Sequence, residues 1–219
     1  MDVSHTLSRG FYVVDLAGVF AGALAGTLTA RRLRDYDVVG VAALALASGV
    51  GGGILRDTLV QQGTPLALTN PSYLLTTLLA FGVGWLFGNA LGPRVQRAIL
   101  VIDAVALGWF AVASSLRCLD AKLGTLPVLL LGVIGAVGGG LMRDLLSAQT
   151  PSIFRRGELY ALAALAASAT FVLLETLHTP RLLNNLMGAS VGAGLRMLSL
   201  RYGWQAPRPP GPRARSETR

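Results

Sequence analysis

The sequence feature that most constrains this chain is a Gly-Gly-Gly-x-x-Arg-Asp motif that occurs twice. Gly51 to Asp57 form the first copy, Gly138 to Asp144 form the second, and both lie inside long apolar runs. Glycine weakens a helix and permits unusual backbone dihedral angles, whereas charged residues are costly inside a membrane. The duplicated motif therefore predicts two broken membrane helices that meet at a functional path between related halves of the protein.

The composition supports a membrane protein. The chain has 219 residues, of which 53% are hydrophobic and 14% are charged, whereas a soluble chain has about 25% charged residues. A spanning helix needs about 20 mostly apolar residues. We predict an all-α membrane protein with seven such helices, at residues 11–30, 38–60, 73–91, 98–116, 126–146, 159–177 and 182–200.

The duplication extends beyond the glycines. Each motif is preceded by an aspartate and followed by a proline and a tyrosine at nearly equal distances: Asp15, Pro65 and Tyr73 around the first, and Asp103, Pro151 and Tyr160 around the second. Each repeat holds three spans, an odd number, so the second repeat is predicted to be inverted in the membrane. The predicted organisation is an N-terminal extension (1–9), two three-helix repeats (10–92 and 93–178), a seventh helix (179–202) and a disordered basic tail (203–219).

Lysine and arginine predict the orientation. With seven spans the termini lie on opposite sides, and most of the basic residues fall on the side of the C-terminus. Basic loops stay in the cytoplasm, so we predict a multi-pass membrane protein with its N-terminus outside and its C-terminus in the cytoplasm. The basic residues that give the net charge of +8 lie between apolar segments or in the tail. They therefore indicate topology signals and no nucleic-acid partner.

The two motifs supply the candidate site residues. Gly51, Gly52 and Gly53, with Gly138, Gly139 and Gly140, are predicted to form hinges and to free backbone carbonyls that replace part of the hydration shell of a cation. Arg56, Asp57, Arg143 and Asp144 either line and gate a hydrophilic path or merely lock the helices together by ion pairs.

The partners of these charges are predicted to lie on other helices. Adjacent helical residues point about 100° apart, so an Arg-Asp neighbour pair is not expected to pair well. Asp15 and Asp103 are candidate partners and further pore or gating charges, but either aspartate could instead cap a helix N-terminus.

Other residues receive less specific predictions. Arg117 and Lys122, at the outer end of the fourth span, are predicted to be interfacial anchors, with a lipid or voltage response as the alternative. Arg196 is predicted to extend to the cytoplasmic interface. Two stripes of glycine, at Gly18, Gly22 and Gly26 and at Gly188 and Gly192, indicate tight helix packing within or between subunits.

We find no catalytic or metal-binding constellation in the sequence. Cys118 is the only cysteine, so it has no partner for an intramolecular disulfide, and His5 and His178 are isolated along the sequence. No nucleophile and base stand in the pattern that covalent catalysis needs. We therefore predict a protein that is not an enzyme and that has no cofactor.

These motifs resemble a known family. The paired glycine motifs, each with a preceding aspartate and a following proline, resemble the bacterial glycine-transporter-domain membrane proteins, which look like the prokaryotic branch of the TRIC (trimeric intracellular cation) channels. The resemblance covers roughly residues 15–200. It implies a seven-helix protomer, a homotrimer with one pore in each protomer, and second and fifth helices kinked at their glycines. The Lys-Glu-Val stretch with which animal members bind phosphoinositide is absent from the fourth span.

The resulting hypothesis is a potassium-permeable channel of the bacterial inner membrane whose pore lies between the second and fifth helices, with lipid and further copies of the chain as partners. The alternative is a secondary transporter of a small solute such as glycine, because inverted repeats with broken helices also occur in transporters. The rate of transport separates the two, since a channel needs neither a coupling ion nor an alternating-access cycle.

Overall fold

In the computed structural model, which describes residues 3–33, 36–154 and 159–204, every regular element is a helix. In chain order the elements are α1 (Val3–Leu33), α2 (Val38–Val60), α3 (Leu66–Thr69), α4 (Pro71–Phe87), the 3-10 segment η1 (Gly88–Arg94), α5 (Val95–Asp120), α6 (Thr125–Leu146), the 3-10 turn η2 (Ser152–Phe154), α7 (Tyr160–Thr176) and α8 (Arg181–Tyr202).

Polar residues and prolines set the helix ends. The Asp37 carboxylate accepts a hydrogen bond from the Gly40 amide at 2.8 Å and so caps the start of α2. The Asn70 side chain accepts from the Ser72 amide at 3.0 Å, and Pro71 occupies the first turn of α4. At its C-terminal end, α2 stops at Gln61, which adopts left-handed dihedral angles. These signals place the short connections where the apolar runs of the sequence end.

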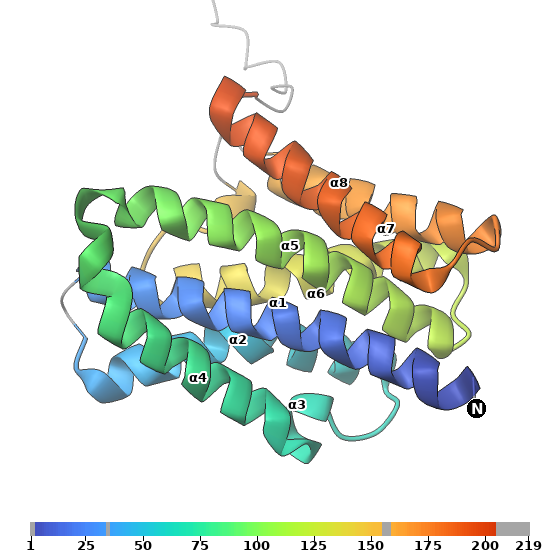
Figure 1. Cartoon of the computed structure of the whole chain (residues 1–219), viewed down its shortest axis with the longest axis horizontal. Helices are drawn as coiled ribbons and strands as arrows, with labels where there is room; N and C mark the ends of the chain where they lie inside the picture. Colours follow the sequence, from blue (N-terminus) through green and yellow to red (C-terminus); the bar gives the residue numbers. More distant parts are fainter. Residues whose placement is uncertain (1–2, 34–35, 155–158, 205–219) are drawn as a thin grey trace, which may run out of the picture.

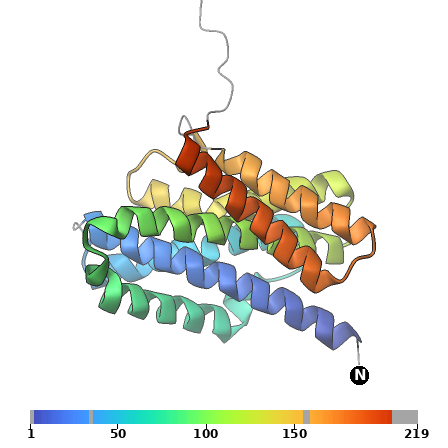
Figure 2. The same cartoon turned by 45° about the horizontal axis from the view of Figure 1, so that its top comes forward.

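The helices form a bundle in which α1 and α5 are central. Helix α1 packs against α2, α4 and α5, and α5 packs against α6, α7 and α8. Figure 1 shows α1 and α5 side by side, with α2 and α6 behind them, α4 along one edge and α8 along the other. After the turn in Figure 2 the same neighbours remain together. Helices α2 and α6 also contact each other, which brings the two glycine motifs to one place.

Each predicted span lies on one helix, but several boundaries need correction, and α5 extends beyond the predicted fourth span at both ends. Helix α1 begins at Val3, within the predicted N-terminal extension. The third span ends earlier than predicted, because α4 stops at Phe87 and η1 follows, with Gly92 at a φ of 46°. Helix α8 continues to Tyr202, and residues 205–219 of the predicted tail lie outside the described part of the chain.

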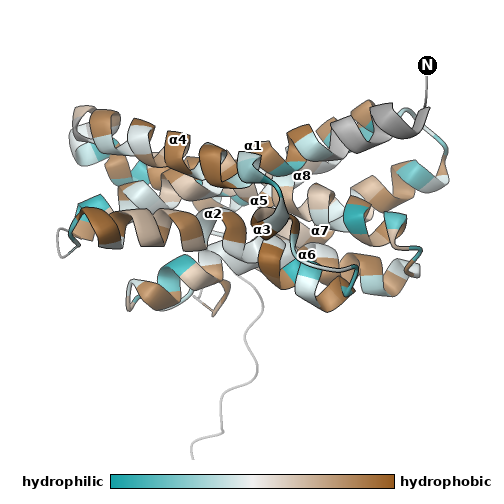
Figure 3. Cartoon of the chain, turned by 90° about the horizontal axis from the view of Figure 1, so that it is seen from below, coloured by the Kyte–Doolittle hydropathy of each residue, from teal (hydrophilic) through white to brown (hydrophobic). Residues whose placement is uncertain are grey.

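The long helices suit a lipid environment. Four described helical segments are both long and apolar enough to cross a membrane, namely Tyr12–Leu33, Val38–Val60, Gly92–Asp120 and Thr125–Leu146, and Pro71–Phe87 and Tyr160–Thr176 are shorter apolar helices. Apolar residues extend along the helices, and hydrophilic ones gather toward many of their ends (Figure 3). Large apolar side chains such as Leu79, Leu86 and Phe87 are exposed, whereas buried polar residues include aspartates and arginines. This distribution indicates a multi-pass membrane protein.

Small residues let the helices approach closely, as the glycine stripes predict. A Cβ on Gly22 would lie 2.8 Å from the Ser48 carbonyl oxygen, and one on Gly26 would lie 2.7 Å from that of Leu44, so α1 rests directly on the backbone of α2. On α8, a Cβ on Gly188 would lie 3.1 Å from the Ala167 carbonyl oxygen of α7. The two stripes therefore pack helices within one protomer.

Candidate functional site

Helices α2 and α6 cross at their glycines with the two backbones in contact. A Cβ on Gly52 would overlap the Gly135 carbonyl oxygen and would lie 3.1 Å from the Gly139 amide nitrogen. A Cβ on Gly139 would in turn overlap the Ser48 carbonyl oxygen, and one on Gly138 would lie 2.9 Å from the Cα of Gly52. Only residues without a side chain permit this approach, so the crossing requires glycine on both helices.

Two apolar side chains close the crossing on either side. The Met142 sulfur lies against Gly51, where an added Cβ would overlap it. Leu55 lies against Gly138, with its Cδ2 at 3.5 Å from the position of an added Cβ. Leu55 and Met142 hold equivalent places in the two motif copies. Each motif therefore covers a glycine of the other with its own apolar side chain.

The structure corrects the predicted helix breaks. Helix α2 runs as one helix from Val38 to Val60 and α6 as one from Thr125 to Leu146, through all three glycines of each motif. A glycine in a helix costs only about 1 kcal/mol relative to alanine, and the close crossing compensates for that cost with backbone packing. Neither helix is interrupted at its glycine triplet, and in this conformation the glycines serve contact between the two helices.

The arginine of the first motif is buried in an ionic cluster. Asp15, Arg56, Asp57 and Tyr73, all at most 4% exposed, form this first ionic cluster. The Arg56 guanidinium donates to both carboxylate oxygens of Asp15, at 3.1 and 3.3 Å, and its Nε donates to Asp57 Oδ1 at 2.8 Å. The Tyr73 hydroxyl donates to Asp15 Oδ2 at 2.7 Å. The cluster joins α1, α2 and α4.

The second motif builds a matching cluster from α5 and α6. Asp103, Arg143 and Asp144, all at most 6% exposed, form this second ionic cluster. Arg143 Nη1 donates to Asp103 Oδ1 at 2.6 Å, and Arg143 Nε donates to Asp144 Oδ1 at 3.1 Å. Each arginine therefore bonds the aspartate that follows it in the chain and the aspartate on the preceding long helix. Such charge-assisted hydrogen bonds are stronger than neutral ones.

Each motif aspartate also holds the connection that follows its helix. Asp57 Oδ2 accepts a hydrogen bond from the Leu66 amide at 2.9 Å, at the start of α3. Asp144 Oδ2 accepts from the Ser152 amide at 2.8 Å and from the Ser152 hydroxyl at 3.0 Å, in η2. The equivalent contacts in both halves tie each loop to the buried charges.

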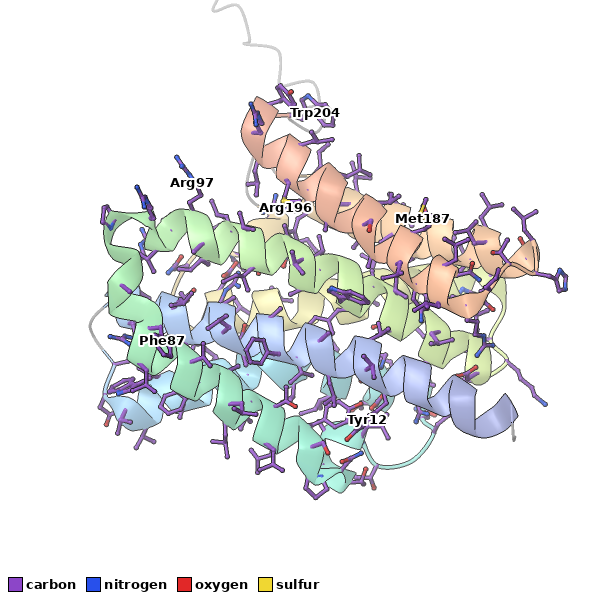
Figure 4. The ribbon with its side chains drawn as sticks, viewed as in Figure 1. Tyr12, Phe87, Arg97, Met187, Arg196 and Trp204 are labelled. Carbon is purple, nitrogen blue, oxygen red and sulfur yellow. The ribbon has the colours of Figure 1, made fainter. Side chains whose placement is uncertain are left out.

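A second arginine stands beside each cluster, and here the two halves differ. Arg117 of α5 approaches Asp57, with 3.8 Å between Nε and Oδ1, and its side chain is 23% exposed. Arg196 of α8 is 1% exposed, and its guanidinium carbon lies 4.8 Å from the centroid of the Tyr160 ring, a cation–π contact. Figure 4 shows Arg196 on the face of α8 toward the bundle.

Several predictions about these charges are resolved by the structure. Asp15 and Asp103 lie within α1 and α5 and bind Arg56 and Arg143, so the pairing prediction is confirmed and the capping alternative is wrong. The expectation that neighbouring Arg and Asp do not pair is also wrong, because the long arginine side chain turns back to its neighbour.

The remaining basic residues divide between burial and exposure. The prediction that Arg196 extends to the interface is wrong, since it is buried against Tyr160. Arg117 is partly buried beside Asp57, whereas Lys122, just beyond the end of α5, is exposed. Arg97 points away from the bundle (Figure 4). From the sequence alone, no functional role is assigned to Tyr73 or Tyr160. The structure places Tyr73 in the first ionic cluster and Tyr160 against Arg196. Their matched distances from the two motifs were the signal that could have indicated these contacts.

In this arrangement the crossing of α2 and α6 is closed, and a buried ionic cluster lies on each side of it. Each ionic cluster contains one guanidinium and two carboxylates, while Arg117 lies beside the first cluster and Arg196 lies over Tyr160. Charges buried in this way persist only when paired. Among the described residues there is no group of three or more His, Cys, Asp or Glu that could hold a metal ion.

Comparison with known proteins places both halves in one family. A family model described as "Glycine transporter" matches residues 12–89 and again residues 100–176. A UPF0126 membrane protein of Deinococcus radiodurans is 37% identical over 200 residues, which cover 91% of this chain and 89% of that protein.

Solved structures share the fold. The TRIC trimeric intracellular cation channel orthologue from Rhodobacter sphaeroides superposes with a TM-score of 0.82 at 33% identity, over 88% of this chain and 98% of that one. A prokaryotic TRIC channel crystallised in 0.5 M KCl superposes with a TM-score of 0.80 at 25% identity, over 89% of this chain and 98% of that one.

Proposed function

Since this chain belongs to the Glycine transporter family, whose fold is that of the TRIC-type channels, we propose that it is a channel for monovalent cations, chiefly potassium. The structures that it resembles at 25% identity or more are channels and not enzymes. In this proposal the chain catalyses no reaction and needs no cofactor.

The membrane arrangement is part of the proposal. The seven long helices cross the membrane as α1, α2 and α4 in one repeat, α5, α6 and α7 in an inverted second repeat, and α8 as an additional span. The matching ionic clusters support the two repeats, because Arg56 and Arg143 bind equivalent aspartates and Asp57 and Asp144 hold equivalent loops. By analogy with the trimeric channel of Rhodobacter sphaeroides, three copies assemble in the lipid bilayer of the bacterial inner membrane.

The pore of each protomer follows the crossing of α2 and α6. The observation that carries this assignment is the direct backbone contact between Gly52 and Gly139, with a buried ionic cluster on each side. Leu55 and Met142 obstruct the crossing here, so conduction requires the two helices to separate. The glycine triplets are the hinges of that movement, because they resist bending less than other helical residues.

In this proposal the charged residues of the two ionic clusters control the passage of cations. The two carboxylates of each cluster attract cations, and the arginines hold those carboxylates in place until the helices move. A partly hydrated cation then passes between the clusters, where the low dielectric constant strengthens every charge interaction.

The test is the reversal potential of the purified protein in a planar bilayer. Under a gradient of potassium chloride, we expect unitary currents that reverse near the potassium equilibrium potential, and replacing potassium by sodium on one side then measures selectivity. Currents that reverse near the chloride potential would contradict the proposal. A silent bilayer, with glycine uptake by proteoliposomes of the same preparation, would establish a secondary transporter instead.

A further inference from the structure

The junction of α5, α6 and α7 holds buried hydroxyl groups of an unusual kind. Ser114 and Ser115 of α5 and Ser168 of α7 are at most 1% exposed, and their side-chain oxygens have no hydrogen-bond partner among the described residues. Buried polar groups in proteins nearly always have a partner, and an unpaired hydroxyl costs about 1–3 kcal/mol. Three such groups in one helix junction therefore leave oxygen atoms available to coordinate a ligand.

The three hydroxyls converge on two glycines of α6. A Cβ on Gly132 would meet both the Ser115 and the Ser168 hydroxyl oxygens, which reach it from α5 and α7 respectively. A Cβ on Gly135, one turn later, would overlap the Ser114 hydroxyl oxygen and would lie 3.4 Å from Arg56 Cβ. The three oxygens therefore occupy the positions that side chains on α6 would fill, directly against the backbone of that helix.

The equivalent part of the first repeat has no such site. Among its described residues, the four buried serine and threonine hydroxyls each donate to a backbone carbonyl oxygen at 2.8–2.9 Å: Thr27 to Ala23, Thr29 to Ala25, Ser48 to Gly22 and Thr77 to Tyr73. The unpaired state in the second repeat is therefore specific to this junction and not a general property of buried hydroxyls in this chain.

The junction borders the proposed path. Gly135 contributes the carbonyl oxygen on which Gly52 rests, so the Ser114 hydroxyl and the crossing of α2 and α6 share one turn of α6. Neutral oxygen atoms are suitable ligands for hard monovalent cations, as in filters lined by carbonyl oxygens. The Arg56 guanidinium is turned to Asp15 and Asp57, and the Arg56 atom nearest to Gly135 is its aliphatic Cβ.

We propose that Ser114, Ser115 and Ser168 form a binding site for a partly hydrated monovalent cation beside the crossing of α2 and α6. The site rests on the proposed function, which it deepens by naming residues that select the permeant ion. It belongs to the second repeat alone, so the two halves of the protomer contribute unequally to permeation.

The test uses silver, a thiophilic monovalent cation whose ionic radius lies between those of sodium and potassium. Cys118 is first replaced in Cys118→Ala, and Ser115→Cys, Ser168→Cys and Ser114→Cys are made separately in that background. Ala113→Cys on α5 and Ala164→Cys on α7 are the matched controls, because both alanines are fully buried on the same helices within apolar clusters. Silver bound per protomer is counted by elemental mass spectrometry after exposure in a chloride-free nitrate buffer.

We expect about one silver ion per protomer in the Ser115→Cys and Ser168→Cys proteins and none in the Ala113→Cys and Ala164→Cys controls. In the two serine variants, silver should bind at least tenfold more slowly in excess potassium nitrate than in the nitrate of an organic cation. Absence of silver at the serine positions, equal silver in the controls, or binding indifferent to potassium would overturn the site. If a cysteine variant does not fold, Ser115→Ala and Ser168→Ala decide the matter: an unchanged potassium-to-sodium permeability ratio in both would overturn it. The silver count needs no current, so a silent wild-type bilayer with potassium-sensitive silver binding would refute the channel and retain the cation site.

Discussion

At the scale of single residues, the glycines of the crossing matter through the side chain that they lack. Gly52→Ala would place a methyl group on the backbone of α6, which is held by its own helix and cannot move aside alone. We expect the substitution to destabilise the protein by about 1–3 kcal/mol, the typical cost of overpacking. The measurement is the thermal midpoint of the purified protein in detergent.

The chain provides its own control for that experiment. A Cβ on Gly82 of α4 would meet nothing within 4 Å, so Gly82→Ala introduces the same methyl group into a helix without a collision. We expect it to be neutral or to stabilise by about 0.5–1 kcal/mol, because alanine favours the helix. Equal losses from both variants would show that the crossing is not a tight contact.

The motif aspartates are expected to matter for current. Asp57→Asn or Asp144→Asn removes one negative charge from a buried cluster while keeping an oxygen that can accept from the Leu66 or Ser152 amide. We expect lower single-channel conductance or altered gating in both, and a stability loss of about 3–5 kcal/mol at most, the cost of breaking a buried ion pair.

Asp37→Asn is the matched control for the charge. Asp37 is exposed and caps α2 through its side chain, and asparagine caps helices equally well. Its currents should equal those of the wild type. Unchanged currents in both Asp57→Asn and Asp144→Asn would remove these carboxylates from the permeation path.

The sequence predicts the site at this scale only in part. The motif reveals which charges are buried and that Asp15 and Asp103 are candidate partners. It does not reveal the Arg56–Asp57 pair, since helix geometry separates the two Cβ atoms while a flexible guanidinium closes the distance. The proposed serine site escapes prediction because the sequence does not show that the Ser114, Ser115 and Ser168 hydroxyls lack the carbonyl partners of other buried serines.

At the scale of helices, the movable contact is the one between α2 and α6. Gly51 and Met142 face each other there, and an added Cβ on Gly51 would lie 3.4 Å from Met142 Cγ, which is compatible with a disulfide between cysteines at the two positions. In the Cys118→Ala background, we expect oxidation of the Gly51→Cys/Met142→Cys protein to abolish current and reduction to restore it.

In the Gly51→Cys/Met142→Cys protein, the second substitution removes the steric clash that the first one introduces. The atom nearest to the added Cβ is the Met142 sulfur, and Met142→Cys removes the outer part of that side chain. The single variant Met142→Cys, treated with the same oxidant, should keep its current. Full current in the cross-linked protein would show that conduction does not require α2 and α6 to separate.

Helix positions follow from the apolar runs, whereas helix continuity does not. The predicted second span matches α2 at both ends, because Asp37 and Gln61 bound an unbroken apolar stretch. The three glycines indicate a weak helix, but the partner backbone on α6 decides that the helix persists. The short α3 and the segment η1 are too brief and too mixed in sequence to give a periodic signal.

At the scale of the whole molecule, the distribution of basic residues makes a prediction about orientation. Lys122 and Arg97 are both exposed and lie at opposite ends of α5. In the Cys118→Ala background, we expect Lys122→Cys to react with a membrane-impermeant maleimide in intact cells and Arg97→Cys to react only after the inner membrane is opened. The reverse pattern would mean that the N-terminus faces the cytoplasm.

The bundle as a whole was predictable from composition and repeat, since low charge, long apolar runs and a twofold motif permit few other arrangements. The position of α8 was not, because it has no counterpart in the repeats. Its place against α5 and α7 depends on Gly188 and Gly192 and on the burial of Arg196 over Tyr160, contacts that become visible only when the helices are assembled.

The contact between Gly52 and Gly139 also bears on how such a chain can evolve. Duplicated segments usually diverge in sequence, because each copy packs against different neighbouring residues. Here each triplet is the neighbour of the other, so a change in one copy alters the surface on which the other rests. A substitution that enlarges either residue demands a compensating change in the other half of the gene, and the fused duplicate therefore inherits the constraint of a symmetric dimer.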